Sequence, residues 1–163
     1  MTEYRTGIGW DIHRLVPDRP LILGGVRIPS YLGLAGHSDA DVLAHAITDA
    51  LLGAAALGDI GQHFPDSDPR WAGADSLQFV RQACELLRVA GYAIENVDST
   101  VLLERPKLKD YRAAIRQSLA EALGLDPGRV SVKFKTAEGL GPVGEGQAAE
   151  AQALAVIRPM RST

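Results

Sequence analysis

The segment that most constrains the fold runs from Asp41 to Leu57, inside a stretch (residues 28–69) that contains neither lysine nor arginine. Its apolar residues recur at positions 43, 46, 47, 50, 51 and 54, which is the spacing of one face of a helix. Gly58 follows as a typical helix terminator. The same stretch carries six aspartates and three histidines. We therefore expect a helix that presents carboxylates and imidazoles with no basic residue beside them.

Strand and helix patterns flank this segment. Strands are expected at residues 4–13, 94–103 and 130–136, and a hairpin is expected between residues 21–23 and 26–28 around Gly24-Gly25. Two more helices are expected, one from a capping-box-like start at Asp75 to Gly91 and one at residues 110–123, which ends at Gly124. Residues 148–157 remain ambiguous, because their alanines favour a helix and their end favours a strand. This order predicts an α/β sandwich with helices layered on a sheet.

Composition narrows the class of protein. The chain has 163 residues, 46% of them hydrophobic and 23% charged, which is typical of one folded domain spanning residues 1–163. No apolar run approaches the ~20 residues of a membrane span, and residues 1–12 lack the order of a signal peptide. The single cysteine, Cys84, forms no internal disulfide, and the net charge of −3 argues against a nucleic-acid binder. We expect a cytoplasmic protein.

Three residues could share a metal ion. Asp11 and His13 lie two apart in a predicted strand and so point to the same side. His45 lies in the predicted helix, where Asp49, one turn away, could orient its ring. Together the three ligands would make a zinc site with an open position, of the catalytic type. The alternative interpretation is a surface pair and a structural histidine.

A basic region complements this acidic one. Residues 104–135 contain eight lysines and arginines against four acids, and residues 105–109 join a strand end to a helix start, where phosphate can bind. Such charge runs can also be solvated surface. His37 precedes the helix without a capping role, whereas Asp39 or Asp41 caps it. No Walker A sequence is present, and the glycines of residues 139–146 do not fit a dinucleotide-binding motif.

These motifs, in this order, resemble the 2-C-methyl-D-erythritol 2,4-cyclodiphosphate synthase family. The matching segments cover nearly the whole chain: Gly9–His13, Leu23–Pro29, Gly36–Val42, His45–Gly61, Phe64–Asp68, Gly73–Ser76, Asn96–Asp98, Arg105–Lys107 and Gly144–Gly146. The resemblance implies a phosphorus–oxygen lyase of the non-mevalonate isoprenoid pathway. It would convert 4-diphosphocytidyl-2-C-methyl-D-erythritol 2-phosphate to the cyclic diphosphate and CMP by intramolecular phosphoryl transfer. The resemblance also implies a mixed sheet with helices on one face, a last strand, and a homotrimer with sites between subunits.

The resemblance implies a role for each matching site residue. Asp11, His13 and His45 would bind zinc, His37 and Thr136 would stabilise the transition state, and Glu138 would bind a second divalent ion, Mg²⁺ or Mn²⁺. The residues expected around the methylerythritol phosphate half are Ser38, Asp59, Ile60, Gly61, Phe64, Pro65, Asp66, Ser67 and Asp68. Those expected around the cytidine diphosphate half are Leu103, Glu104, Arg105, Pro106, Lys107, Leu108, Lys109, Lys135 and Ala137.

The chain departs from this family in one loop. Residues 138–146 are two residues shorter than the common family sequence and lack its Phe and Arg, the latter near the trimer axis where an isoprenoid diphosphate can bind. Two other functions stay open on the residues alone. One is a metal-dependent phosphohydrolase with the same three ligands, and the other is a non-catalytic α/β binding domain. Release of CMP without inorganic phosphate would distinguish the three.

Overall fold

The computed structural model describes residues 3–160, so the ends of the expected domain, residues 1–2 and 161–163, lie outside the described residues. A five-stranded sheet with the order β4-β1-β7-β5-β6 forms the base of the fold. Its strands are β1 (Arg5–Pro17), β4 (Leu32–Leu34), β5 (Tyr92–Leu102), β6 (Val130–Lys135) and β7 (Ala148–Pro159). Among them, β5 and β6 pair in parallel and the other neighbours are antiparallel. The expected mixed sheet is thereby confirmed.

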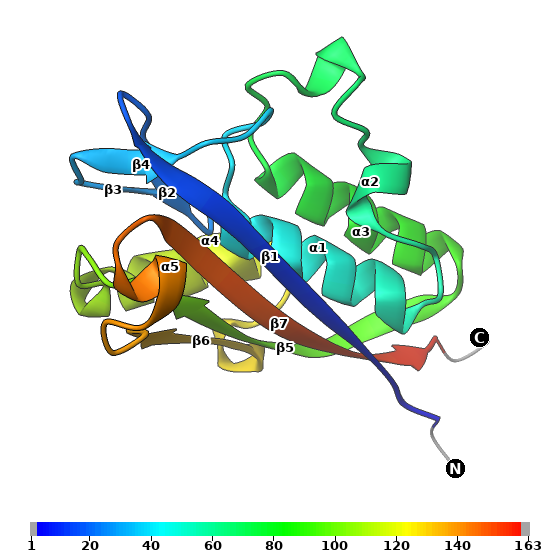
Figure 1. Ribbon diagram of the computed structural model, residues 1–163. Coiled ribbons are helices and arrows are strands. Elements are labelled where there is room, and N and C mark those ends of the chain that lie inside the picture. Colours follow the sequence, from blue (N-terminus) through cyan, green and yellow to red (C-terminus); the bar gives the residue numbers. More distant parts are fainter. Residues whose placement is uncertain (1–2, 161–163) are drawn as a thin grey trace.

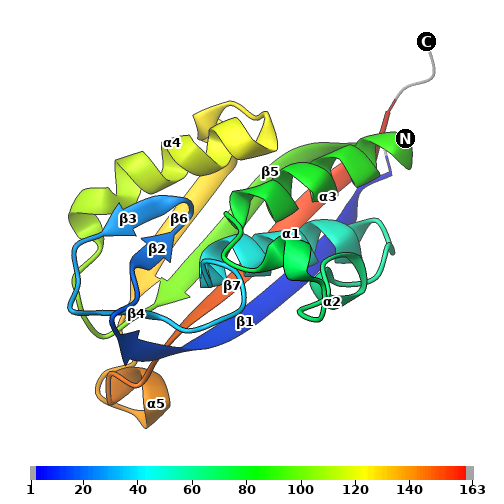
Figure 2. The same ribbon diagram turned by 90° about the horizontal axis from the view of Figure 1, so that it is seen from above.

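Three helices cover one face of this sheet (Figures 1 and 2). They are α1 (Val42–Ala54), α3 (Leu77–Val89) and α4 (Arg112–Leu123), and two helices of four residues each, α2 (Ile60–His63) and α5 (Gly141–Gly144), lie in connections. The expected hairpin is confirmed as β2 (Leu21–Leu23) paired with β3 (Val26–Ile28). No helix within residues 3–160 is both long enough and apolar enough to cross a membrane.

Local chemistry explains the helix ends. Asp41 caps α1, since its carboxylate accepts hydrogen bonds from the backbone N–H groups of Leu43 and Ala44. Gly124 ends α4 in the left-handed conformation, as expected. At the start predicted for α3, the Asp75 carboxylate accepts a 2.9 Å hydrogen bond from the backbone N–H of Leu77, as expected of a cap. The next residue, Ser76, makes no capping bond, and its hydroxyl donates to Asp39 instead.

The ambiguous segment is a strand because α1 packs closely against the sheet. The alanines of β7 at positions 149, 151, 153 and 155 are buried, and β7 pairs with β1 along ten residues. On β1 the closest approach is at Gly9, where an added Cβ would lie 1.8 Å from the carbonyl oxygen of Ala46 in α1. Asp11 and His13 continue the same face of β1. The sequence of small residues thus brings α1, with His45, directly over the two strand ligands.

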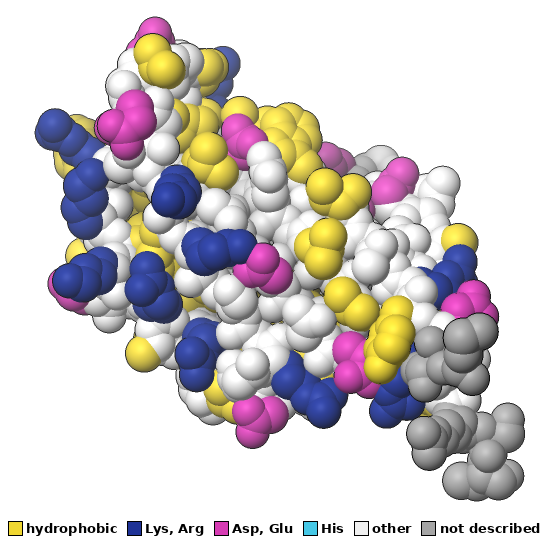
Figure 3. All heavy atoms as spheres, turned by 90° about the horizontal axis from the view of Figure 1, so that it is seen from below, with side chains coloured by type: hydrophobic (Ala, Val, Ile, Leu, Met, Phe, Trp, Pro, Cys, Tyr) yellow, Lys and Arg dark blue, Asp and Glu magenta, His cyan; other side chains and the backbone are white. Residues whose placement is uncertain are grey.

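Within the part of the chain that the structure describes, the other face of the sheet carries no helix. Ile8, Trp10 and Ile12 on β1 point to this side, and Ile8 (74% exposed) and Trp10 (53% exposed) are largely accessible. Leu154 on β7 pairs with Ile8 in the register of the two strands. Figure 3 shows this side of the molecule, with apolar side chains across its middle and most of the lysines and arginines toward one end. We refer to these four residues as the open apolar stripe.

Candidate metal centre and substrate cavities

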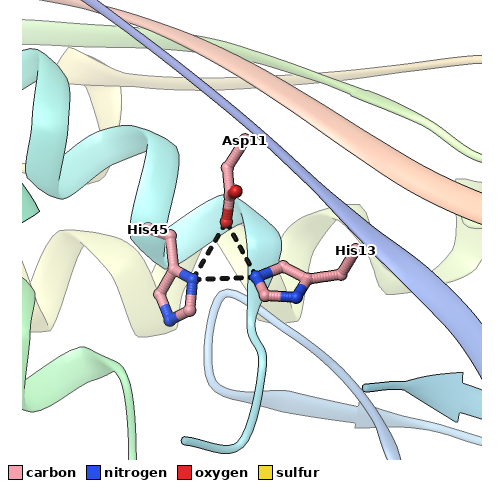
Figure 4. A group of neighbouring side chains, drawn as sticks. All are labelled: Asp11, His13 and His45. Atoms are coloured by element: carbon pink, nitrogen blue, oxygen red, sulfur yellow. Dashed lines mark hydrogen bonds and ion pairs between the residues drawn. The ribbon is translucent and has the colours of Figure 1, made fainter. Parts of the chain in front are cut away.

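Asp11, His13 and His45 meet over the N-terminal half of α1 (Figure 4). The Asp11 Oδ2 atom lies 2.9 Å from His13 Nε2 and 2.9 Å from His45 Nδ1, and the two nitrogens are 3.1 Å apart. Around a tetrahedral zinc ion, ligand atoms are separated by about 3.4 Å. Within the described residues, these three side chains are the group of histidine, cysteine, aspartate or glutamate residues that could hold a metal ion. The predicted ligand triad is therefore assembled by the fold.

Hydrogen bonds behind the rings determine which nitrogens face the centre. His13 Nδ1 lies 2.7 Å from the carbonyl oxygen of Ala35, which can only accept, so this nitrogen carries the proton and Nε2 offers its lone pair. His45 Nε2 lies 2.9 Å from the Ser76 hydroxyl and 3.1 Å from that of Ser38. In each imidazole, one nitrogen thus faces Asp11, and the other lies within hydrogen-bond distance of a backbone carbonyl or a serine hydroxyl.

Electrostatics keep the Asp11 carboxylate ionised, and the same carboxylate favours a proton on His13, which a bound metal ion would have to displace. Burial raises the pKa of Asp11, but hydrogen bonds and charge interactions with His13 and His45 outweigh it and bring the pKa down to about 2. Burial by itself lowers the pKa of His13, because it disfavours the charged imidazolium. The hydrogen bond and charge of the Asp11 carboxylate outweigh burial, so the pKa of His13 is raised overall. Two imidazole nitrogens and one carboxylate suit Zn²⁺ better than Mg²⁺, which prefers oxygen ligands alone. The donor set fits the expected zinc ion.

The prediction that Asp49 orients the His45 ring is wrong. The Asp49 carboxylate accepts a hydrogen bond of 2.7 Å from the backbone N–H of Ile60, and both ring nitrogens of His45 have other partners. Asp49 instead fixes the start of α2 to the helix that carries the metal ligand. Sequence spacing places it one turn from His45 but does not show where its carboxylate points.

A cavity of about 360 Å³ opens beside the triad. One wall is aromatic: the rings of Phe64 and Phe79 are stacked with centroids 4.6 Å apart, and Trp71 meets Phe79 edge-on at 5.5 Å. Phe79 also lies 5.9 Å from the His45 ring. Sequence analysis gave no role to Trp71 or Phe79, although Trp71 follows the residue 64–68 loop closely enough to suggest one.

Most residues expected around the methylerythritol phosphate half lie on this cavity. The predicted residues that line it are His37, Ser38, Ile60, Gly61, Phe64, Pro65 and Asp66. Asp59, Ser67 and Asp68 do not line it. The Asp59 carboxylate caps α2, and that of Asp68 caps residues 69–71 and pairs with Arg70 at 2.6 Å. Their positions support the loop that carries the lining residues.

A second cavity, of about 230 Å³, lies at the ends of β5 and β6. Its predicted lining residues are Leu103, Pro106, Lys107, Leu108, Lys109, Lys135 and Thr136, and it adds Arg112 and Phe134, which sequence analysis did not assign. Glu104 and Arg105 line a more open cavity of about 940 Å³ on the other side of residues 106–107. The 360 Å³ and 230 Å³ cavities share no lining residue.

Glu138 lies beside Thr136 outside the metal triad. Its backbone is left-handed, with φ at 54°, and its carboxylate accepts a 2.7 Å hydrogen bond from the Thr136 hydroxyl. The backbone N–H of Ala137 donates to the Glu104 carboxylate at 3.1 Å. The loop after β6 is thus fixed with the Thr136 hydroxyl and the Glu138 carboxylate side by side.

Comparisons with known proteins agree on one family. The model of the YgbB family matches residues 4–158. A 2-C-methyl-D-erythritol 2,4-cyclodiphosphate synthase of Solibacter usitatus is 68% identical, over 96% of this chain and 99% of the relative. Among solved structures, the bifunctional IspDF of Campylobacter jejuni superposes with a TM-score of 0.94 at 41% identity, covering 98% of this chain and 43% of that one. IspF of Plasmodium falciparum, in a CDP complex, gives 0.85 at 36% identity and 97% coverage of both chains.

Proposed function

The chain belongs to the YgbB family, and we infer that it is a cyclodiphosphate synthase that makes 2-C-methyl-D-erythritol 2,4-cyclodiphosphate for isoprenoid biosynthesis. The substrate is 4-diphosphocytidyl-2-C-methyl-D-erythritol 2-phosphate. An oxygen of its 2-phosphate attacks the β-phosphorus, the bond from that phosphorus to the CMP oxygen breaks, and CMP leaves. The reaction is that of a phosphorus–oxygen lyase. The observation that carries this inference is the Asp11–His13–His45 triad beside a cavity.

Asp11, His13 and His45 are the proposed zinc ligands. If a zinc ion is bound there, these three residues would hold it and it would supply Lewis-acid neutralisation of charge on the diphosphate. The protein contributes a fixed ligand set and an aromatic wall, which excludes water from one side of the cavity. Intramolecular phosphoryl transfer depends on such positioning and charge neutralisation more than on a protein nucleophile, and none is needed here.

His37 and Thr136 are proposed to stabilise the transition state. His37 lines the metal cavity, where its ring would donate to a phosphate oxygen, and its Nε2 atom lies 3.3 Å from the Asp68 carbonyl oxygen. The Thr136 hydroxyl, which donates to the Glu138 carboxylate in this structure, would donate to the phosphate once that bond is released. Glu138 is the proposed ligand of a second divalent ion, Mg²⁺ or Mn²⁺, which would neutralise the diphosphate, and Lys107, Lys109 and Lys135 add positive charge around the nucleotide half.

We further propose that complete sites form between the subunits of a homotrimer. Two observations support this arrangement. The cavity of about 360 Å³ beside the metal triad and the cavity of about 230 Å³ at the ends of β5 and β6 share no lining residue. The open apolar stripe also leaves a sheet face that a second copy can cover. Each subunit would be one synthase domain, residues 1–163. The free, half-buried Cys84 is consistent with the cytoplasmic location that we propose.

Phosphorus NMR of the substrate with purified protein and zinc tests the function. We expect the diphosphate resonances to be replaced by those of a cyclic diphosphate and of CMP, with no inorganic phosphate. Inorganic phosphate as a product would instead indicate a phosphohydrolase. Unchanged substrate in the presence of zinc and Mg²⁺ would contradict the proposal.

A further inference from the structure

A chain of polar side chains lies behind His45, on the side away from the metal cavity. The Ser76 hydroxyl is 2.9 Å from His45 Nε2 and donates a hydrogen bond to the Asp39 carboxylate at 2.5 Å. Asp39 also accepts from the backbone N–H groups of Ser76 and Asp41. Ser76 is completely buried. None of the proposed roles uses Ser76 or Asp39, and their contact joins residues 37 positions apart.

The direction of these bonds follows from the groups themselves. An ionised carboxylate only accepts, so the hydroxyl proton of Ser76 is committed to Asp39. The remaining lone pairs of the Ser76 oxygen can then only accept, and the groups facing them are His45 Nε2 at 2.9 Å and the Ser38 hydroxyl at 3.1 Å. An unprotonated Nε2 would set its lone pair against those of Ser76, so this contact favours a proton on His45 Nε2 and leaves the Nδ1 lone pair toward Asp11 and His13.

The opposite tautomer would have a favourable partner of its own. Asp11 Oδ2 lies 2.9 Å from His45 Nδ1 and would accept a hydrogen bond from a proton on that nitrogen. A proton there would occupy the lone pair that a metal needs. Something must hold the proton on the other side of the ring, and the Ser76–Asp39 pair is placed to do so.

Ser38 does not provide the same control. Its hydroxyl lies 3.1 Å from His45 Nε2 and 3.1 Å from the Ser76 oxygen, and it accepts from the backbone N–H of Ala40. The Ser38 proton has no carboxylate to receive it, so without Ser76 it can turn toward the ring and donate. Ser38 alone is therefore compatible with either tautomer.

We propose that Ser76 and Asp39 form a positioning relay for the metal centre, Asp39 to Ser76 to His45, which commits His45 Nδ1 to metal binding. The inference rests on the proposed metal function of the triad and deepens it. Partners that orient a ligating histidine typically account for about 10- to 100-fold in metal affinity. We expect Ser76 and Asp39, which would touch neither the metal nor the substrate, to account for a change of that size in zinc affinity.

The test measures the zinc dissociation constant of the full chain by competition with a chromophoric chelator. The variants are Ser76→Ala, Asp39→Ala and the double variant, with Ser99→Ala as the matched control. Ser99 is also buried, and its hydroxyl donates to the carbonyl oxygen of Ser131 at 2.9 Å, away from the centre. We expect each single variant to weaken zinc binding about 10- to 100-fold and Ser99→Ala to match the unmodified chain.

The double variant separates a relay from two independent effects. If Asp39 acts through Ser76, adding Asp39→Ala to Ser76→Ala changes zinc affinity by no more than about 2-fold. Proton NMR of the zinc-loaded protein gives a second readout, since the His45 Nε2–H signal should exchange slowly with water and broaden in Ser76→Ala. If Ser76→Ala does not fold, Asp39→Ala carries the test, because it retains the Ser76 hydroxyl and removes only the acceptor of its proton.

Each outcome bears on one hypothesis. Zinc affinity and a His45 ring signal that match the Ser99→Ala control in both single variants would overturn the relay and leave the metal centre standing. Losses that multiply in the double variant would also overturn it. A chain that binds no zinc before any substitution would contradict the proposed metal function itself.

Discussion

The closest contact between strand and helix makes Gly9→Ala the sharpest test of how the centre is built. The added Cβ would lie 1.8 Å from the Ala46 carbonyl oxygen, and contacts under 3.0 Å are essentially never seen. Because the opposing atom belongs to the backbone and cannot rotate away, α1 must move by more than about 1 Å. Overpacking of this kind costs about 1–3 kcal/mol, and we expect the upper end. For a chain of this size, that lowers the melting temperature by about 6–12 °C.

The displacement should also reach the metal centre. His45 precedes Ala46 in α1, whereas Asp11 follows Gly9 on the same face of β1, so the helix shift separates the ligands. Metal–ligand distances tolerate changes of only about 0.2 Å, and we expect zinc affinity to fall at least about tenfold. Thermal unfolding and zinc competition measure the two effects.

Gly53→Ala is the matched control in the same helix. Its added Cβ would meet nothing nearer than the Ile8 carbonyl oxygen at 3.9 Å, and alanine is the better helix residue by about 0.5–1 kcal/mol. We expect this variant to be at least as stable as the unmodified chain and to bind zinc equally well. If Gly9→Ala matches Gly53→Ala in both measurements, the close approach does not position the ligands.

Three other expectations concern the site. His45→Ala should lose both zinc, by elemental analysis, and turnover, while it keeps its assembly state; a zinc-replete, active variant would remove His45 from the ligand set. His37→Ala should keep zinc but turn over on the order of 100- to 1000-fold more slowly, and loss of zinc would make it a ligand instead. His13→Ala and Glu138→Ala chains, refolded together in equal amounts, should recover about 25% of activity, because each mixed trimer has one boundary with both intact halves. No recovery beyond separately refolded samples, with mixed trimers shown by mass, would place each site within one chain.

The parts of the centre that sequence could predict are those set by local periodicity. Asp11 and His13 share a face because strand residues alternate, and His45 belongs to a helix with a clear apolar repeat. What local spacing could not predict is where side chains find partners across the fold. Asp49 serves α2 rather than His45, and the Ser76 hydroxyl serves Asp39 rather than its own helix.

The last strand shows the same limit for the backbone. Alanine-rich residues 148–157 have a helical preference of their own, and they form a strand because small side chains are what fits beneath α1. Local preference is overridden by packing at that position. The apolar face of α1 is predictable from the sequence. How closely that helix approaches Gly9 and the alanines of β7 is not.

The hydrogen bond from Ile60 to Asp49 links two kinds of motion. The donor is the backbone N–H of the first residue of α2, which lines the metal cavity. The acceptor is a side chain of α1, a helix that is buried along most of its length. An amide in a surface connection ordinarily exchanges its hydrogen through small local fluctuations, whereas one held by a core helix exchanges when that helix opens. We therefore expect the Ile60 amide to exchange more slowly than its neighbours in this connection, and its exchange rate measures how firmly the cavity wall is held to α1.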